Sequence, residues 1–402
     1  MLALEGIKVV EMAAWAFGPA AGVILGDWGA DVVKIEDPAG GDPMRGIEMI
    51  GGRPAPQKYS MFDIDNRNKR SIVIDLKKEQ GRKVVYKLIE GTDIFVTNYR
   101  VAALERLGMD YLTLAKINPR LIYAYCSGYG DEGPDKDKSG FDFGAYWARG
   151  GFMLQLGGEG TPPVPQGGAG LGDQPSGALA AGGIALALFV RERTGMGQKV
   201  SLSLLHSALW TASLCVQATM EYGIEWPRAR REAAANPLAN NYQTKDGKRM
   251  QLLMLQSDRF WPDFCKVMGL ERLREDPRFS SMLARAENNA ELISILDQTF
   301  ATKTRDEWAG RFKGTTIMWD PANTFADLTR DPQVLANDCF VPFEHPAKGG
   351  IKIIASPIQL SKTPATIRRH APEFGEHTEE VLLEMGYDWE DITRFKEEEV
   401  IP

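Results

Sequence analysis

The chain has 402 residues, of which 44% are hydrophobic and 25% are charged, and its formal net charge is −7. This is the composition of an ordinary globular enzyme, and the length favours two domains or one large composite domain. The negative net charge argues against a nucleic-acid partner, and no apolar run reaches the roughly 18 residues that a membrane span needs. The four cysteines form no C-x-x-C pair, so we expect no disulfide framework, no bound metal and a cytoplasmic location.

The first 130 residues alternate between predicted strands and predicted helices. One helix is predicted at 18–28, where a proline is tolerated in the first turn. Strands connected by single helices imply right-handed crossovers and a largely parallel sheet. We therefore predict an α/β fold whose large domain is Rossmann-like. The predicted strands lie at 7–11, 31–36, 71–75, 93–97 and 121–125, and a second helix places Val84, Val85, Leu88 and Ile89 on one face.

The rest of the chain divides at a polar, arginine-rich break at 226–232. Before this break we predict a helix from about 174 to 193, a strand at 198–203 and a long helix at 204–222. After it, the pattern of 242–253, with Asp246-Gly247 in the turn, predicts a β-hairpin followed by helices. The predicted organisation is a large domain over 1–225, a smaller α+β domain over 226–325, and a C-terminal segment over 326–402 whose amphipathic helix at 378–385 returns to the large domain.

Asp173 stands between a Gly- and Pro-rich stretch, 157–172, and an apolar helical segment that begins at Gln174. Aspartate is a preferred N-cap residue, so the local pattern by itself favours a capping role over a catalytic one. The sequence offers few other reactive groups, because it lacks a G-x-G-x-x-G turn after the first strand, a G-x-S-x-G elbow and an H-E-x-x-H motif. Its four histidines are scattered. We therefore expect the chemistry to rest on a carboxylate.

Basic residues gather between positions 67 and 106. Most are expected to form a solvated helix face with charge pairs to residues such as Glu79. The remainder would suit a ligand with several phosphates, because arginine and lysine neutralise phosphate oxygens at short range. The set comprises Arg67, Lys69, Arg70, Lys77, Lys78, Arg82, Lys83, Lys87, Arg100 and Arg106.

Short motifs follow one another along nearly the whole chain: Leu4–Glu11, Gly18-Pro19, Leu25–Glu36, Asn68–Ile72, Asp75–Lys77, Val96–Tyr99, Arg106–Gly108, Asn118–Ile122, Gly170–Asp173 and Arg193–Ser201. This series resembles that of the class III CoA-transferases, the family of formyl-CoA transferase and carnitine CoA-transferase. Further segments at 133–137, 140–142, 148–151 and 206–208 resemble one subgroup of that family. Its members exchange CoA between 2-hydroxy acids and their 2-enoyl products, and phenyllactate and 2-hydroxyisocaproate CoA-transferases are examples.

The resemblance implies an enzyme that moves CoA from an acyl-CoA to a free carboxylic acid, here a 2-hydroxy acid or its 2-enoate. It implies that Asp173 is the nucleophile and carries CoA as an aspartyl thioester, without a metal. It also implies an interlocked homodimer, in which each chain forms an open ring threaded by its partner. The CoA contacts that it implies are Ile74, Asp75, Leu76, Lys77, Asn98, Tyr99, Arg100, Arg106, Ser139, Gly140, Phe141 and Asp142.

An acid-binding pocket is expected close to the nucleophile. Aromatic rings in it would hold an apolar or aryl side chain, and an arginine would pair with a free carboxylate. The alternative interpretation is core and interface packing with a surface arginine. The candidates are Trp15, Ala16, Phe17, Tyr146, Trp147 and Arg149.

The chain departs from the family pattern at three positions. Oxalate-using members carry glutamine where this chain has Ala16, so oxalate and formate are not expected as substrates. Asp37 stands where some members have a CoA-binding arginine, and Phe141 stands where the related 2-methylacyl-CoA racemases have histidine. Two other functions stay open at this point. One is a 2-methylacyl-CoA racemase or an intramolecular CoA-transferring isomerase, and the other is a non-catalytic CoA-binding protein in which Asp173 is only a helix cap.

Overall fold

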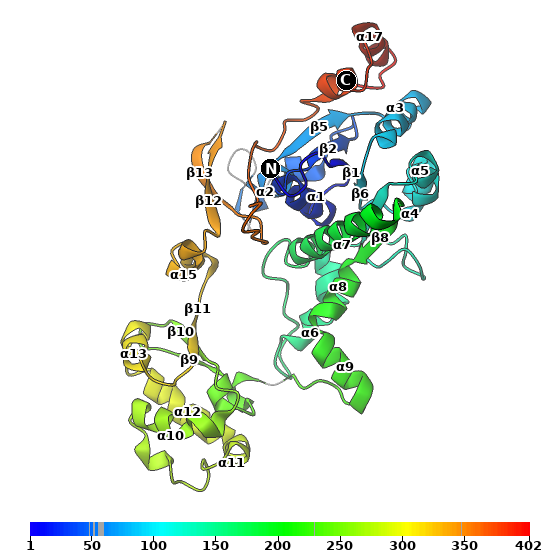
Figure 1. The fold of residues 1–402 in the computed structure, drawn as a ribbon. Coiled ribbons are helices and arrows are strands. Elements are labelled where there is room, and N and C mark those ends of the chain that lie inside the picture. Colours follow the sequence, from blue (N-terminus) through cyan, green and yellow to red (C-terminus); the bar gives the residue numbers. More distant parts are fainter. Residues whose placement is uncertain (48, 51–52, 55–59, 229, 347) are drawn as a thin grey trace. The chain divides into compact units, whose positions relative to one another are not determined.

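The computed structural model describes residues 1–47, 49–50, 53–54, 60–228, 230–346 and 348–402. The chain forms two compact units (Figure 1). The first unit comprises Met1–Leu154, Val164–Ile224 and Asp338–Pro402, and the second comprises Gln155–Pro163 and Glu225–Asn337. The chain therefore leaves the first unit for the second and returns to the first at Asp338. None of the described helices is long and apolar enough to cross a membrane.

A six-stranded sheet forms the centre of the first unit. All neighbouring strands run parallel. Their order in the sheet is β5-β2-β1-β6-β7-β8. When the six strands are numbered along the chain, this is the order 3-2-1-4-5-6 of a doubly wound sheet. The parallel sheet predicted from the alternating pattern is confirmed. The strands are β1 (Lys8–Met12), β2 (Asp31–Glu36), β5 (Lys69–Val73), β6 (Ile94–Thr97), β7 (Ile122–Ser127) and β8 (Lys199–Ser203).

The third strand of this sheet along the chain, β5, begins earlier than predicted. We expected it at 71–75, but it spans Lys69–Val73. The side chains of Lys69 and Arg70 are buried, which the sequence pattern does not favour for charged residues. They are accommodated because each forms ion pairs, Lys69 with Glu11 and Arg70 with Asp31.

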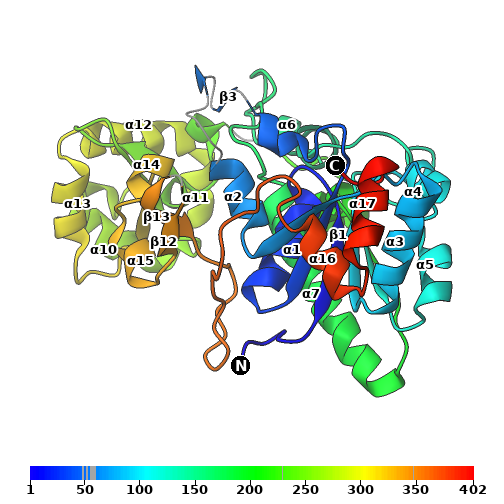
Figure 2. The ribbon, with the colours of Figure 1, turned by 90° about the horizontal axis from the view of Figure 1, so that it is seen from above.

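Helices cover both faces of this sheet (Figure 2). Alternate strand residues point to opposite faces, so that Val9 packs on the α1 side and Val10 on the other. One face is covered by α1 (Phe17–Asp27), α7 (Asp173–Thr194) and α8 (Leu204–Thr211). The other is covered by α3 (Glu79–Glu90), α4 (Val101–Leu107), α5 (Tyr111–Ile117), α16 (Thr378–Glu384) and α17 (Trp389–Glu397).

The end of the chain packs on the edge strand β5. The backbone N–H of His377 donates to the Ser71 carbonyl at 2.9 Å, and the Val73 N–H donates to the Thr378 hydroxyl at 3.0 Å. These bonds occupy backbone groups that an edge strand otherwise leaves open to another chain. Before this point the chain forms a hairpin of β12 (Phe340–His345) and β13 (Gly349–Ile354).

The helix predicted at 204–222 is divided in two. Helix α8 ends at Thr211, and α9 (Ser213–Tyr222) follows after Ala212. The Thr211 hydroxyl donates to the Ser207 carbonyl four residues earlier, at 2.9 Å. Such a bond competes with the backbone ladder and bends helices. The sequence holds no proline or glycine here that would have predicted the break.

The second unit contains the predicted hairpin and a set of helices. Strands β9 (Asn241–Gln243) and β10 (Arg249–Leu252) are antiparallel, and Gly247 between them has a φ of +76°. The hairpin is confirmed, and β11 (Trp319–Ala322) adds a third antiparallel strand beside β10. The helices of this unit are α10 (Ser257–Met268), α11 (Met282–Glu287), α12 (Asn289–Phe300), α13 (Arg305–Phe312), α14 (Phe325–Leu328) and α15 (Pro332–Ala336).

Glycine residues allow α1 to lie close to its neighbours. A Cβ atom at Gly22 would stand 1.8 Å from Glu11 Oε2, and one at Gly177 in α7 would stand 2.5 Å from the Ala20 Cβ. We expect Gly22→Ala to destabilise the protein by about 3 kcal/mol or more, because the added methyl group displaces a buried, ion-paired carboxylate. The midpoint of urea unfolding measures this effect.

Gly182→Ala in α7 is the matched control. No atom lies within 4 Å of a Cβ built at Gly182. Alanine is the better helix former, so this variant should gain about 0.5–1 kcal/mol of stability. Equal effects of the two substitutions would show that the close approach at Gly22 does not constrain the fold.

Candidate active site

The site lies at the carboxyl ends of β1 and β6, which are adjacent in the sheet although they are not consecutive in the chain. Ligands of doubly wound sheets bind at such a switch point. Asn98 follows β6 and joins it to the loop after β1, because its side chain accepts from the Ala14 N–H at 3.0 Å and donates to the Ala14 carbonyl at 2.6 Å. The amide therefore fixes the two strand ends that border the crevice.

Asp173 is the first residue of α7, and Gly172 is the N-cap. The side chain of Asp173 makes no capping bond, and no residue in the described ranges donates a hydrogen bond to its carboxyl group. Gly172 packs against Tyr146, since a Cβ there would lie 2.5 Å from the Tyr146 ring. The N-cap interpretation of Asp173 is therefore wrong, and the carboxyl group is left for another role.

The Asp173 carboxyl group titrates far from its usual range. Burial raises the pKa of Asp173 to about 8, and the negative charges of Asp142 and Asp65 add to this shift. Strongly perturbed carboxyl groups in a cavity are typical of functional sites, because a stable fold does not need them. The raised pKa is therefore typical of a functional carboxyl group whose burial lowers the stability of the fold.

We expect Asp173→Asn to gain stability relative to the wild type as the pH rises from 5 to 9. The folded-state pKa of about 8 exceeds the ordinary value of 3.8. Between these values the folded protein holds a proton that the unfolded chain has released, so wild-type stability falls with rising pH. Urea unfolding at several pH values measures the difference. A capping role would give the opposite sign, because a charged cap stabilises its helix above pH 4.

The first cavity, of about 370 Å³, opens beside Asp173 at the carboxyl edge of the sheet. Several basic side chains line it, including Lys136 and Lys138, which the sequence did not single out. In the described part of the chain, Arg100 and Arg106 form no ion pair with an acidic residue, so their charges are free for a ligand. The cavity brings together with Asp173 the predicted residues Trp15, Phe17, Asn98, Tyr99, Arg100, Arg106, Ser139, Gly140 and Phe141.

A smaller cavity of about 130 Å³ adjoins the first and shares Tyr99, Ala103 and Arg106 with it. Its walls include the predicted residues Ile74, Leu76 and Lys77. Asp75 lines no described cavity, and its carboxylate instead accepts from the Lys77 N–H at 2.9 Å. The two adjoining cavities form a long, partly cationic recess.

Three other members of the basic set have structural roles. Arg67 pairs with Asp27, Lys69 pairs with Glu11, and Arg70 pairs with Asp31 and with two glutamates of α16. These side chains are buried. Lys83 forms an exposed pair with Glu79, as predicted for a solvated helix face. A ligand with several phosphates would therefore meet only part of the basic set.

A third cavity, the acid cavity, has a volume of about 640 Å³ and lies on the other side of Asp173. It shares Trp15, Phe141 and Asp173 with the first cavity. The Trp15 and Phe141 rings meet edge to face with centroids 5.6 Å apart. Most of its remaining lining is apolar, and it comprises Ala16, Val23, Ile24, Met44, Ile47, Met61, Ile64, Asp65, Arg67, Asp142, Phe143, Ala169, Gly170, Gln174, Pro175, Ala178, Ile354, Ala355 and Pro357.

Three predicted acid-binding residues lie elsewhere. The Tyr146 hydroxyl donates to the Thr211 hydroxyl at 3.0 Å. Trp147 donates from its ring nitrogen to the Val164 carbonyl at 2.8 Å, and Arg149 pairs with Asp135. None of the three lines the first cavity or the acid cavity. The apolar wall of the acid cavity was not predicted from the sequence. It comes from η1 (Pro43–Gly46), α2 (Ser60–Asn66) and the segments that follow η1 and β13. These elements are too short for a periodic pattern.

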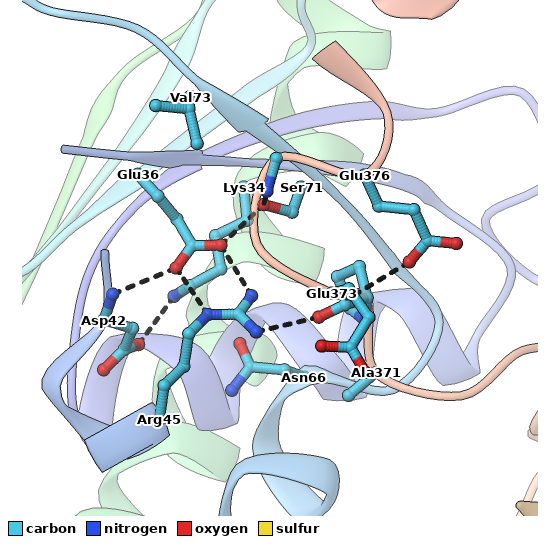
Figure 3. A network of polar contacts seen from close by, with 12 residues as sticks. Lys34, Glu36, Asp42, Arg45, Asn66, Ser71, Val73, Ala371, Glu373 and Glu376 are labelled. Carbon is cyan, nitrogen blue, oxygen red and sulfur yellow. Dashed lines mark hydrogen bonds and ion pairs between the residues drawn. The ribbon is translucent and has the colours of Figure 1, made fainter. Parts of the chain in front are cut away.

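Trp15 has a φ of +66°, a strained backbone conformation for a residue other than glycine. Asp42 stabilises it by accepting from the Trp15 N–H at 3.0 Å. The other Asp42 oxygen lies 2.9 Å from Lys34 Nζ (Figure 3). Lys34 also lies 3.0 Å from Glu11 Oε1, and all three of these charged side chains are fully buried. Although burial opposes ionisation, the Lys34 charge and the N–H donors lower the pKa of Asp42.

Glu36 extends this buried network (Figure 3). Its carboxylate accepts from Arg45 Nε at 2.9 Å, from the Ser71 hydroxyl at 2.6 Å and from the Asp42 N–H at 2.9 Å. Arg45 donates in turn to the Pro372 carbonyl at 3.0 Å. The network therefore ties the loop that carries Asp42 to β2, β5 and the C-terminal segment.

Comparisons with known proteins agree with this arrangement. A sequence profile of CoA-transferase family III matches residues 4–378. The chain is 38% identical over 401 residues to the cinnamoyl-CoA:phenyllactate CoA-transferase of Clostridium sporogenes, covering 99% of this chain and 97% of that protein. It is 37% identical over 403 residues to the (R)-2-hydroxy-4-methylpentanoate CoA-transferase of Clostridioides difficile, covering 99% of each.

A solved structure of a CAIB/BAIF family protein from Brucella suis matches with a TM-score of 0.81 and 28% identity, over 95% of this chain and 99% of that one. The family profile, the two relatives and the solved structure each match this chain over nearly its full length. The chain belongs to CoA-transferase family III and is an acyl-CoA:carboxylate CoA-transferase.

Proposed function

We propose that this enzyme transfers CoA between an acyl-CoA and a 2-hydroxy acid or its 2-enoate, with Asp173 as the covalent nucleophile. The observation that carries the proposal is the position of Asp173. Its carboxyl group has no hydrogen-bond donor among the described residues and borders both the cationic recess and the apolar acid cavity. A group at this junction can contact the thioester of a bound acyl-CoA from one side and the acid from the other.

The reaction begins when the Asp173 carboxylate attacks the donor thioester carbonyl. This forms a mixed anhydride and expels the CoA thiolate. The thiolate then attacks the aspartyl carbonyl, which gives an Asp173–CoA thioester and releases the donor acid. An acceptor carboxylate repeats the two steps in reverse and restores Asp173, so the thioester energy is retained. Covalent catalysis of this kind replaces one difficult step by several easier ones.

The lining of the acid cavity supports an acid with an apolar branch. Side chains such as Met44, Ile47, Met61 and Ile64 present hydrocarbon to the space beside Asp173. The two relatives reported above are named for phenyllactate and for a hydroxy-methylpentanoate. The first of these acids has an aryl side chain and the second has a branched apolar one. Ala16 lies in the same wall and leaves room where a larger polar residue would fill it.

A panel of acceptor acids tests the proposal. The enzyme is incubated with a cinnamoyl-CoA or branched enoyl-CoA donor and one acid at a time, and new CoA esters are detected by mass spectrometry. We expect transfer to aryl and branched 2-hydroxy acids. A preference for short dicarboxylic acids would reject the substrate class, and exchange of the C2 hydrogen without release of the donor acid would indicate a racemase.

We propose that the cationic recess binds CoA and predict that Arg106→Ala weakens CoA binding by about 1.5–3 kcal/mol. Arg106 lies where the two adjoining cavities meet and has no acidic partner in the described part of the chain. Removal of a charge-assisted phosphate contact has this magnitude. Isothermal titration with CoA measures it, and Lys77→Ala gives a second estimate.

Arg120→Ala is the control for Arg106. Arg120 is an exposed arginine that precedes β7, at the amino edge of the sheet. It should leave the affinity for CoA unchanged. If Arg106→Ala and Arg120→Ala both bind CoA like the wild type, the recess does not bind phosphate through Arg106.

We further propose that the active form is an interlocked homodimer. Helices α8 and α9 expose large apolar side chains, among them Trp210, Leu214 and Met220, with exposed fractions of 69%, 85% and 73%. Large apolar side chains exposed in this way are unfavourable in water and suit a permanent interface. The chain leaves the first unit after Ile224 and returns to it at Asp338, which is the connectivity that a threaded ring requires. A stable, active monomer at micromolar concentration in light scattering would contradict this arrangement.

A further inference from the structure

Asp65 is a buried carboxylate in the wall of the acid cavity that the mechanism above does not use. It lies near the end of α2 and is 2% exposed. Its Oδ1 atom accepts from Gln174 Nε2 at 2.7 Å. In the described ranges no residue donates to Oδ2. Because Asp65 lines the cavity, a donor on a bound ligand is the natural partner for this second oxygen.

The position of Asp65 relative to the nucleophile limits where that donor can be. Gln174 directly follows Asp173 in the first turn of α7, so the Asp65–Gln174 bond ties Asp65 to the neighbour of the nucleophile. The negative charge of Asp65 also acts on the Asp173 carboxyl group. A ligand donor that reaches Asp65 while its carboxyl carbon reacts at Asp173 therefore belongs to the part of the ligand near that carbon.

The other polar groups in this wall are already engaged. Arg67 donates to Asp27 and to the Ile64 carbonyl, and Asp142 accepts from Gln166 and from the Phe143 N–H. Burial raises the pKa of Asp65 to about 6, so near neutral pH the group is largely an acceptor. An ionised acceptor in apolar surroundings is costly unless a donor satisfies it.

We propose that Asp65, oriented by Gln174, determines acid specificity by accepting a hydrogen bond from the C2 hydroxyl group of the substrate. The proposal rests on the proposed function and identifies Asp65 as the residue that recognises the C2 hydroxyl group. A site built around such a bond uses an acid that lacks the hydroxyl, the 2-enoate included, less efficiently than the 2-hydroxy acid, because the buried carboxylate is then left without a partner. It also distinguishes the two enantiomers, since only one places the hydroxyl on the Asp65 side.

The test compares two acceptors of one carbon skeleton, a 2-hydroxy acid and its deoxy analogue, by kcat/KM for CoA transfer. The wild type should prefer the hydroxy acid by about 10- to 100-fold. In Asp65→Leu the ratio should fall to within about threefold of one, and the preference for one enantiomer should disappear. Glu192→Leu, which removes an exposed acidic residue near the other end of α7, should keep the wild-type ratio.

Each outcome decides the proposal. A folded Asp65→Leu variant that keeps the wild-type ratio overturns it, and so does a parallel loss with both acceptors, which would show that Asp65 only positions Gln174. If Asp65→Leu does not fold, the wild-type ratio decides, because a ratio near one overturns the proposal without any variant. A wild type that uses neither acceptor but does use dicarboxylic acids overturns the proposed function itself.

Discussion

Asp173→Ala is expected to reduce CoA transfer by at least about 10³-fold without loss of stability. The residue is proposed to form two successive covalent intermediates, and loss of a covalent nucleophile commonly costs this much or more. Its side chain makes no capping bond in α7, so its removal leaves the helix N-terminus as it was. Steady-state transfer rates and urea unfolding, measured on the same preparation, test both parts.

Asp388→Ala is the matched control. Asp388 is the N-cap of α17, where it forms a capping box with Asp391. This variant should lose about 1 kcal/mol of stability and retain its transfer rate. Asp173→Ala should therefore lose activity but not stability, and Asp388→Ala should lose stability but not activity. Hydroxylamine added during turnover should modify Asp173, and activity above a few per cent in Asp173→Ala would reject it as the nucleophile.

Lys34→Met is expected to destabilise the protein by about 3–5 kcal/mol. Lys34 is the fully buried cation between Glu11 and Asp42, at 3.0 and 2.9 Å. Its removal leaves two buried carboxylates with the single positive charge of Lys69, and breaking a buried pair by removing one partner has this cost. Because Asp42 also holds the Trp15 N–H, the strained loop beside Asp173 should loosen as well.

Lys83→Met provides the comparison on the surface. Lys83 lies 2.8 Å from Glu79 with exposed side-chain fractions of 60% and 72%. Exposed helix pairs of this kind are worth about 0.5 kcal/mol or less. Chemical unfolding gives the loss of stability in each variant. A much larger loss for Lys34→Met than for Lys83→Met would show that the burial of the ion pair, and not charge pairing alone, accounts for the loss. A loss below about 1 kcal/mol for Lys34→Met would contradict the structural role of the network.

The sheet was predictable because its strands are apolar and its connections are helical. Residues 31–36 were predicted as a strand and form β2. The start of β5 was not predictable, since Lys69 and Arg70 are charged and become compatible with burial only beside acidic residues from other strands. No local pattern contains that information. The division between α8 and α9 likewise has no helix-breaking residue in the sequence that would have predicted it.

The site divides in the same way. Asn98 and Tyr99, which follow β6, occur in a sequence motif and were named from the resemblance, whereas Trp15, after β1, was predicted as a candidate for the acid-binding pocket. The apolar wall of the acid cavity was not predicted, because it is assembled from short elements far apart in the chain, such as the segments at Met61 and Ile354. Asp65 gave no signal of its own, since a single acidic residue in a polar segment is ordinary.

The acid cavity has one further consequence, for how members of this family diverge. Met44, Ile47, Met61 and Ile64 lie on segments outside the six-stranded sheet. Substitutions there can reshape the space that we propose for the acid, while the sheet and α7, which begins at Asp173, remain as they are. Selection can therefore act on substrate range and on thioester chemistry separately. A combinatorial library confined to these four positions should yield enzymes with new acceptor acids at little cost to folding.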